Sequence, residues 1–266
     1  MLGDLAVRFA SAVAIGAPFL LAVYAGSPYF DLVIILAGGL LAWEWSRLTA
    51  PSGDGRPSGR GAVFVGCTLL AVSAASLLSP GAALAVVAAA ALGLLLWARR
   101  ERWLAAGVAY LALPCIALLW LRGDVADGRS IVFWLLAVVW SSDVGAYFAG
   151  RIIGGPKLAP AISPNKTWAG FFGGAAAAAL VGAIAGPLMG AERVGLLVAI
   201  SVLLGVSAQG GDLFESWLKR RFGVKDTSAL IPGHGGVLDR VDGLMVAAVL
   251  LALIGLTGRG SMLAWL

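Results

Sequence analysis

Nine long apolar runs constrain this chain more than any other feature of its sequence. Each is close to the about 20 apolar residues that an α-helix needs to cross the hydrocarbon of a bilayer. They lie at residues 9–25, 30–48, 62–79, 81–98, 103–121, 131–150, 168–189, 196–217 and 237–256. With 60% hydrophobic and 12% charged residues, the chain is too apolar for a soluble domain of 266 residues. It predicts an all-α, polytopic integral membrane protein with about nine transmembrane helices, because barrel strands would alternate polar and apolar residues.

The basic residues between the runs predict the orientation in the membrane. If the N terminus is cytoplasmic, thirteen Lys and Arg residues lie in cytoplasmic segments, against four outside: Arg122, Arg129, Arg193 and Arg259. Cytoplasmic loops carry such an excess of positive charge. We therefore expect a multi-pass protein of the inner (cytoplasmic) membrane, with its N terminus inside and its C terminus outside. The net charge of +5 fits attraction to anionic membrane lipids, so it does not indicate nucleic-acid binding.

The polar residues are unevenly distributed along the chain. The first five runs lack buried charge apart from Glu44, whereas residues 140–242 hold nearly all the unusual polar residues. This predicts an N-terminal transmembrane region at 1–128 and a C-terminal region at 129–266 that carries the function, with cytoplasmic loops at 151–167 and 218–236. A Gly-, Pro- and Ser-rich stretch at 50–61 is expected to be a flexible divider.

Acidic residues inside three of the last four runs indicate a functional cavity, since an acid within a membrane span is costly and needs a reason. They are Asp143, Asp212, Glu215, Asp239 and Asp242. A spacing of three residues puts each of the last two pairs on one helical face. Because all five lie toward the cytoplasmic side, folding can gather them around one cation. The alternative is that each acid pairs with Arg151, Lys219 or Arg240 at a helix end.

The ligand chemistry of these acids favours Mg²⁺. Hard oxygen ligands without a His or Cys cluster select magnesium over zinc, and a second cation is compatible with the set. Magnesium commonly bridges carboxylates to nucleotide phosphates, while Lys and Arg neutralise the remaining charge. The chain has no Walker-type phosphate loop. The Pro-rich loop 154–168 is the candidate substitute, although an ordinary cytoplasmic turn with positive charges explains it equally well.

The stretch SWLKRRFGVKDTSALIPGHGGVLDRVD, residues 216–242, packs charged residues between two apolar runs. It includes the single histidine of the chain, His234, for which a hydrogen bond to phosphate and an inert loop position are both open. The stretch resembles the signature of the phosphatidate cytidylyltransferases, the CDP-diacylglycerol synthases. Two upstream segments also resemble that family: Asp143-x-Gly145-Ala146-Tyr147 and Ser163-Pro164-Asn165-Lys166-Thr167-Trp168. One departure is Ala169, where an acidic residue is expected, so that position receives no role.

The resemblance implies that CTP and phosphatidate react to give CDP-diacylglycerol and pyrophosphate. It implies Asp212 and Asp239 as the first metal ligands, with Asp226 and Asp242 next and Asp143 as a further candidate. Phosphate-handling or catalytic roles fall to Lys219, Arg220, Lys225, Asp226, His234 and Arg240. Substrate binding falls to Ser163, Lys166, Thr167 and Ser216. The resemblance also makes a homodimer plausible.

Three other classes of protein are weighed against this interpretation. A transporter would need a polar path across the bilayer, and the outer halves of the runs show little of one. A lipid-binding scaffold would leave the paired acids unexplained. A CDP-alcohol phosphotransferase normally resembles DGx2ARx8Gx3Dx3D, and Asp242-Gly243 lacks the rest of that pattern.

Overall fold

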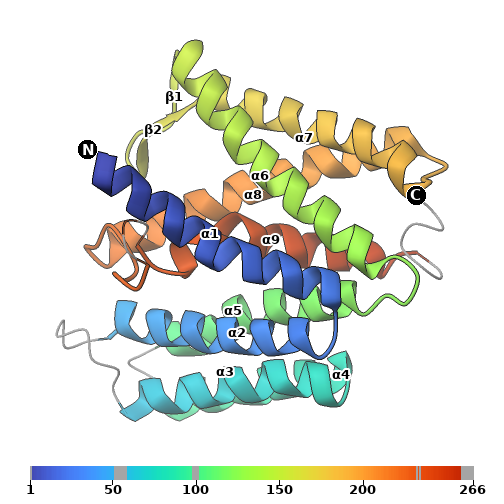
Figure 1. Ribbon diagram of the computed structural model, residues 1–266. Helices are drawn as coiled ribbons and strands as arrows, with labels where there is room; N and C mark the ends of the chain where they lie inside the picture. Colours follow the sequence, from blue (N-terminus) through green and yellow to red (C-terminus); the bar gives the residue numbers. More distant parts are fainter. Residues whose placement is uncertain (1, 51–58, 98–101, 232, 234, 259–266) are drawn as a thin grey trace. The chain divides into compact units, whose positions relative to one another are not determined.

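The computed structural model describes residues 2–50, 59–97, 102–231, 233 and 235–258. In this part of the chain nine helices and one small hairpin form (Figure 1). The helices are α1 (Leu2–Ala25), α2 (Tyr29–Leu48), α3 (Gly59–Leu77), α4 (Pro80–Trp97), α5 (Arg102–Arg122), α6 (Gly128–Ile152), α7 (Trp168–Met189), α8 (Val194–Arg221) and α9 (Leu238–Gly255). The hairpin pairs β1 (Lys157–Ala159) with β2 (Ser163–Thr167) in antiparallel fashion. The predicted all-α membrane architecture is confirmed.

Seven of the described helices, α2 to α8, are long and apolar enough to cross a membrane. The apolar part of α1 is shorter, at Val13–Ala25. Helix α9 carries Asp239, Arg240 and Asp242 in its first turns, before a continuous apolar stretch. The multi-pass character therefore follows from the length and composition of the helices. The charged residues of α9 lie at its N-terminal end.

The chain divides into two compact units. The first contains residues 1–123 and 222–241, and the second contains residues 124–221 and 242–266. The boundary after residue 123 lies close to the division predicted from the sequence at residue 128. The segment 222–241, however, groups with the N-terminal helices. The divider expected at 50–61 falls mostly on residues 51–58, outside the described residues.

In the first unit, α2, α3, α4 and α5 pack against one another around large buried side chains such as Phe30, Phe64 and Leu111 (Figure 1). The indole Nε1 of Trp45 donates to the carbonyl oxygen of Trp103, 2.8 Å away, and ties α2 to α5. These contacts make the first unit a helical scaffold with a closely packed centre.

In the second unit, helix packing depends on small residues. Every fourth residue of α7 is small and buried, in the series Gly170, Gly174, Ala178, Gly182 and Gly186. A Cβ added at Gly173 would lie 2.9 Å from the carbonyl oxygen of Gly145 in α6. Such stripes let membrane helices approach closely, which compensates for the weak apolar driving force between helices in lipid. The resulting α6, α7 and α8 layer supports the hairpin and the polar end of α8.

Candidate functional site

Helix α8 presents four polar residues near its C-terminal end. Asp212 and Ser216 are one turn apart, and the Ser216 hydroxyl donates to Asp212 Oδ1 over 3.3 Å. Glu215 and Lys219 form an ion pair, with 3.3 Å between Glu215 Oε2 and Lys219 Nζ. Glu215 is fully buried. The predicted spacing of three between Asp212 and Glu215 therefore places both acids in the same part of α8.

Close packing of two glycines brings α9 to these acids. A Cβ on Gly211 would lie 2.6 Å from the Asp242 carbonyl oxygen, and one on Gly243 would lie 3.1 Å from the Ala208 carbonyl oxygen. Neither helix can therefore carry larger residues at these positions without moving apart. The glycines explain how Asp242 of α9 reaches the acids of α8.

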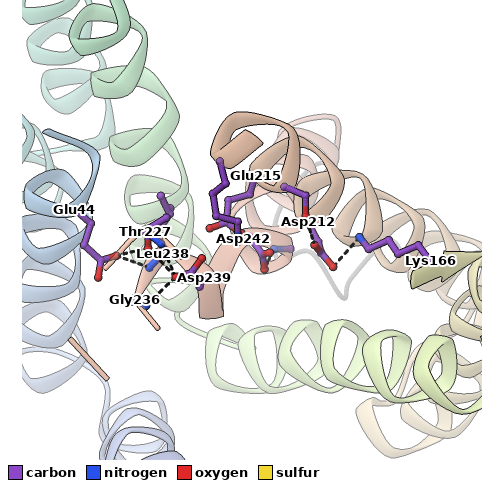
Figure 2. Close-up of polar contacts among 12 residues, drawn as sticks. Glu44, Lys166, Asp212, Glu215, Thr227, Gly236, Leu238, Asp239 and Asp242 are labelled. Carbon is purple, nitrogen blue, oxygen red and sulfur yellow. Dashed lines mark hydrogen bonds and ion pairs between the residues drawn. The ribbon is translucent and has the colours of Figure 1, made fainter. Parts of the chain in front are cut away.

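Asp242, Glu215 and Asp212 form what we call the acidic cluster (Figure 2). The Asp242 side chain interacts with the side chains of Glu215, Asp212 and Lys219. Three carboxyl groups beside a lysine are costly to hold together, because like charges in a partly buried place repel one another. A cation relieves that repulsion, so the cluster is chemically suited to hold one.

The hairpin contributes a second lysine. Lys166 of β2 lies 2.7 Å from Asp212 Oδ2, measured from its Nζ atom (Figure 2). The neighbouring Thr167 is buried, and its hydroxyl oxygen accepts from the Gly170 amide over 3.0 Å, so it caps the N terminus of α7. Thr167 was predicted to bind substrate. The structure gives it a capping role that fixes where Lys166 leaves the hairpin, and its contact with substrate stays a prediction.

Segment 222–241 has its own network within the first unit. Asp239 is 8% exposed, and its Oδ2 accepts from the Thr227 amide at 2.9 Å, the Thr227 hydroxyl at 2.9 Å and the Gly236 amide at 2.8 Å. The two amides and the hydroxyl hold the turn before α9 in place. Asp239 therefore positions this segment, and its predicted part in metal binding stays a prediction.

Glu44 is the residue whose role sequence reasoning missed. Its carboxylate, in α2, accepts hydrogen bonds from residues 228, 237 and 238, more than 180 positions later in the chain (Figure 2). The available signal was an acid well inside an apolar N-terminal run, since a buried carboxylate needs partners. Its partners could not be read from the sequence.

The other predicted site residues differ in their exposure to solvent. Arg220, Lys225, Asp226 and Arg240 are exposed, and Ser163 is half-buried. Asp143 is also exposed on α6, next to the buried Ser142, whose hydroxyl donates to the Gly205 carbonyl oxygen over 3.3 Å. Ser142 therefore faces α8, and the predicted part of Asp143 in metal binding stays a prediction. His234 lies outside the described residues.

Within the described residues, no three His, Cys, Asp or Glu side chains already stand in a metal-binding arrangement. Asp212 and Glu215 each face a lysine. All the same, the donors of the acidic cluster are carboxylate oxygens, the type that Mg²⁺ prefers. The residues present fit a hard divalent cation.

The fold and the site together define a multi-pass membrane protein with carboxylates and lysines gathered near the end of α8. Comparison with known proteins makes this specific. The chain belongs to the cytidylyltransferase family, whose model matches residues 6–257.

Three similar proteins share the name phosphatidate cytidylyltransferase. A phosphatidate cytidylyltransferase of Brucella suis biovar 1 is 42% identical over 96% of this chain and 94% of its own length. One of Pseudomonas aeruginosa is 36% identical over 94% of each chain. One of Staphylococcus epidermidis is 42% identical over 48% of this chain and 50% of its own. The family predicted from the signature motif is confirmed.

Proposed function

We propose that this protein transfers CMP from CTP to phosphatidate, giving CDP-diacylglycerol and pyrophosphate in phospholipid biosynthesis. One observation carries the proposal: in a multi-pass member of the cytidylyltransferase family, three carboxylates and two lysines meet where α8, α9 and the hairpin come together. The names of the relatives point to the same reaction.

In this reaction a phosphate oxygen of phosphatidate attacks the α-phosphorus of CTP. The bond from that phosphorus to the β-phosphate oxygen breaks, and pyrophosphate leaves. The attacking oxygen is already ionised near neutral pH, so the protein has little need of a general base. The barrier is the approach of two polyanions. Positioning and charge neutralisation therefore dominate, as in other phosphoryl-type transfers.

The acidic cluster is the proposed binding site for Mg²⁺. Asp212 and Asp242 would hold the cation with Glu215, and Asp239 and Asp143 remain further candidates. When bound, magnesium supplies charge neutralisation for the CTP phosphates. A second cation is compatible with the number of acids.

Basic side chains complete the charge balance. Lys166 and Lys219 contact the cluster carboxylates, so each is held at the site by an ion pair before any phosphate arrives. Both lysines can then contact substrate phosphates. Exposed Arg220, Lys225 and Arg240 offer further positive charge to CTP or to the phosphatidate headgroup.

The reaction is proposed to take place at the cytoplasmic face of the inner membrane. There CTP is available from solution while the acyl chains of phosphatidate stay in lipid. The excess of basic residues in the segments around the hairpin and after α8 supports this side. A homodimer stays a prediction, which the mass of the purified protein in detergent tests directly.

Labelled CTP tests the reaction and separates it from its alternatives. Purified protein is incubated with phosphatidate, Mg²⁺ and CTP labelled at either the α- or the γ-phosphate. The α-label is expected in a CDP-lipid and the γ-label in pyrophosphate. A transporter would move substrate into proteoliposomes without turning over CTP. A CDP-alcohol phosphotransferase would consume CDP-diacylglycerol when given an alcohol, and either result would contradict the proposal.

A further inference from the structure

Glu44 is a fully buried acid near the C-terminal end of α2. Its Oε1 accepts from the Ser228 hydroxyl at 2.6 Å and from the Val237 amide at 2.8 Å. Its Oε2 accepts from the Leu238 amide at 2.7 Å and lies 3.4 Å from the Thr227 hydroxyl. All these partners belong to segment 222–241, in the same compact unit as Glu44.

The Leu238 amide is the first N–H group of α9, which begins at that residue, and the Val237 amide directly precedes it. The first turn of a helix has N–H groups without partners in the helix, and it carries a partial positive charge. A carboxylate placed there satisfies those groups, and hydrogen bonds to a charged acceptor are the stronger kind. Glu44 therefore caps α9 from a different helix.

Asp239 holds the same segment from within. Its Oδ2 accepts from Thr227 and Gly236, while Glu44 accepts from the residues that follow them, Ser228, Val237 and Leu238 (Figure 2). A Cβ added at Gly236 would lie 2.8 Å from the Glu44 carboxyl carbon, so only glycine lets the turn come this close. The two carboxylates together hold residues 227 and 228 and the turn at 236–238 that leads into α9.

We propose that Glu44 is a positioning residue for the reaction: it fixes the segment that carries Lys225, Asp226 and Arg240, without touching substrate itself. The catalytic part of this inference rests on the proposed function. The structural part, that Glu44 keeps segment 222–241 ordered, does not. Trypsin cleavage tests the structural part, and kinetic constants test the catalytic part.

The variant Glu44→Gln tests the inference sharply because of its geometry. Each oxygen of the carboxylate accepts from a backbone amide. In Gln one of the two oxygens becomes an NH₂ group, which donates only. Whichever way the amide is turned, one backbone N–H of the α9 start then loses its acceptor, while the size of the side chain is unchanged.

The first readout is trypsin cleavage after Lys225, which is exposed, with cleavage after Lys157 in the hairpin as the internal reference. Loss of a buried acceptor weakens local order, so cleavage after Lys225 relative to Lys157 should rise about tenfold in Glu44→Gln. This readout needs no substrate, so it stands even if the proposed activity fails. Equal relative cleavage in the variant and the wild type would overturn the inference.

The second readout is the kinetic constants for CTP, measured beside the matched variant Trp45→Phe. That change removes the bond from Trp45 to the Trp103 carbonyl oxygen and keeps every hydrogen-bonding group of Glu44 and its partners. We expect kcat to fall about tenfold or more in Glu44→Gln, because positioning contributes directly to the barrier, and to stay near wild type in Trp45→Phe. The same loss of kcat in both variants would show a general loss of stability and would overturn the positioning role.

Discussion

Asp239 and Asp212, the two aspartates predicted as first metal ligands, differ in the partners of their carboxylate oxygens. Asp239 Oδ2 accepts three hydrogen bonds from its own segment. The Asp212 oxygens contact the Lys166 ammonium and the Ser216 hydroxyl instead. Both of these groups are on side chains that can rotate. Lysine can exchange one anion for another with little rearrangement of the backbone. Asp212 is thus the better suited of the two to take up a cation.

Asp212→Asn should lower turnover at least about a hundredfold while leaving the protein folded and in the membrane, because it keeps the side-chain size and removes the charge that binds the cation. Initial rates are measured across a magnesium titration. The exposed Glu192 offers a matched control, since Glu192→Gln removes a charge far along the chain from the acidic cluster and should change nothing. Near wild-type rates for Asp212→Asn at limiting magnesium would show that Asp212 is no essential ligand.

Lys166→Gln should raise the KM for at least one substrate about tenfold, since a lost positive charge leaves phosphate repulsion uncompensated in a partly desolvated site. Lys157→Gln, in the partner strand of the same hairpin and exposed, is the matched control and should behave as wild type. Each variant is assayed against CTP, phosphatidate and magnesium in turn. Full recovery of Lys166→Gln by added magnesium alone would assign Lys166 to the metal site rather than to a phosphate.

The acids of the candidate site could be predicted one by one, because a carboxylate inside an apolar run stands out against its surroundings. The hydrogen-bond partners of the site residues were harder to predict from the sequence. The capping role of Thr167 depends on where α7 begins, and the bonds of Glu44 join residues more than 180 positions apart. Such contacts follow from tertiary packing, which no local pattern in a single sequence encodes.

At the scale of elements, apolar runs predicted the helices well and their ends less well. Helix α8 continues to Arg221, four residues beyond the end predicted from hydropathy. Three basic residues fill its last turn, Lys219, Arg220 and Arg221, where positive charge complements the helix dipole. The extension matters because it places Lys219 one helical turn after Glu215. The hairpin at 157–167 was expected only as a loop of fixed shape.

Gly211→Ala should separate α8 from α9 and lower activity about tenfold or more, because the new Cβ would meet the Asp242 backbone oxygen at 2.6 Å. The adjacent Gly210 is the matched control: a Cβ there meets nothing within 4 Å, and Gly210→Ala should keep activity. Rates and thermal unfolding midpoints are compared for both variants. Equal effects of the two substitutions would contradict the close helix contact as the reason that Asp242 joins the acidic cluster.

At the scale of the whole molecule, hydropathy and charge predicted an all-α multi-pass protein, and the signature motif predicted its family. What the sequence did not predict is the grouping of residues 222–241 with the first five helices. The hydrogen bonds of Glu44 supply the physical reason. They also require the end of α2 and this segment to lie on one side of the membrane, as the basic residues predict.

Labelling of single cysteines in intact cells tests the orientation, after Cys67 and Cys115 are replaced by Ala. A cysteine at the exposed Leu230 should be protected from a membrane-impermeant reagent, and a cysteine at Gly258 should react, because the positive-inside bias puts residue 230 in the cytoplasm. Permeabilised cells provide the control in which both should react. The reverse pattern in intact cells would overturn the topology together with the cytoplasmic CTP site.

We propose that this chain makes CDP-diacylglycerol with its acidic cluster. The most direct measurement compares purified wild type with Asp242→Asn, using CTP labelled at the α-phosphate, phosphatidate and Mg²⁺, with and without a chelator. We expect labelled CDP-lipid from the wild type with Mg²⁺, and none above background from the variant or after chelation. A wild type that forms no labelled lipid would contradict the proposed reaction, and an Asp242→Asn protein that forms it as fast as the wild type would contradict the role of the acidic cluster.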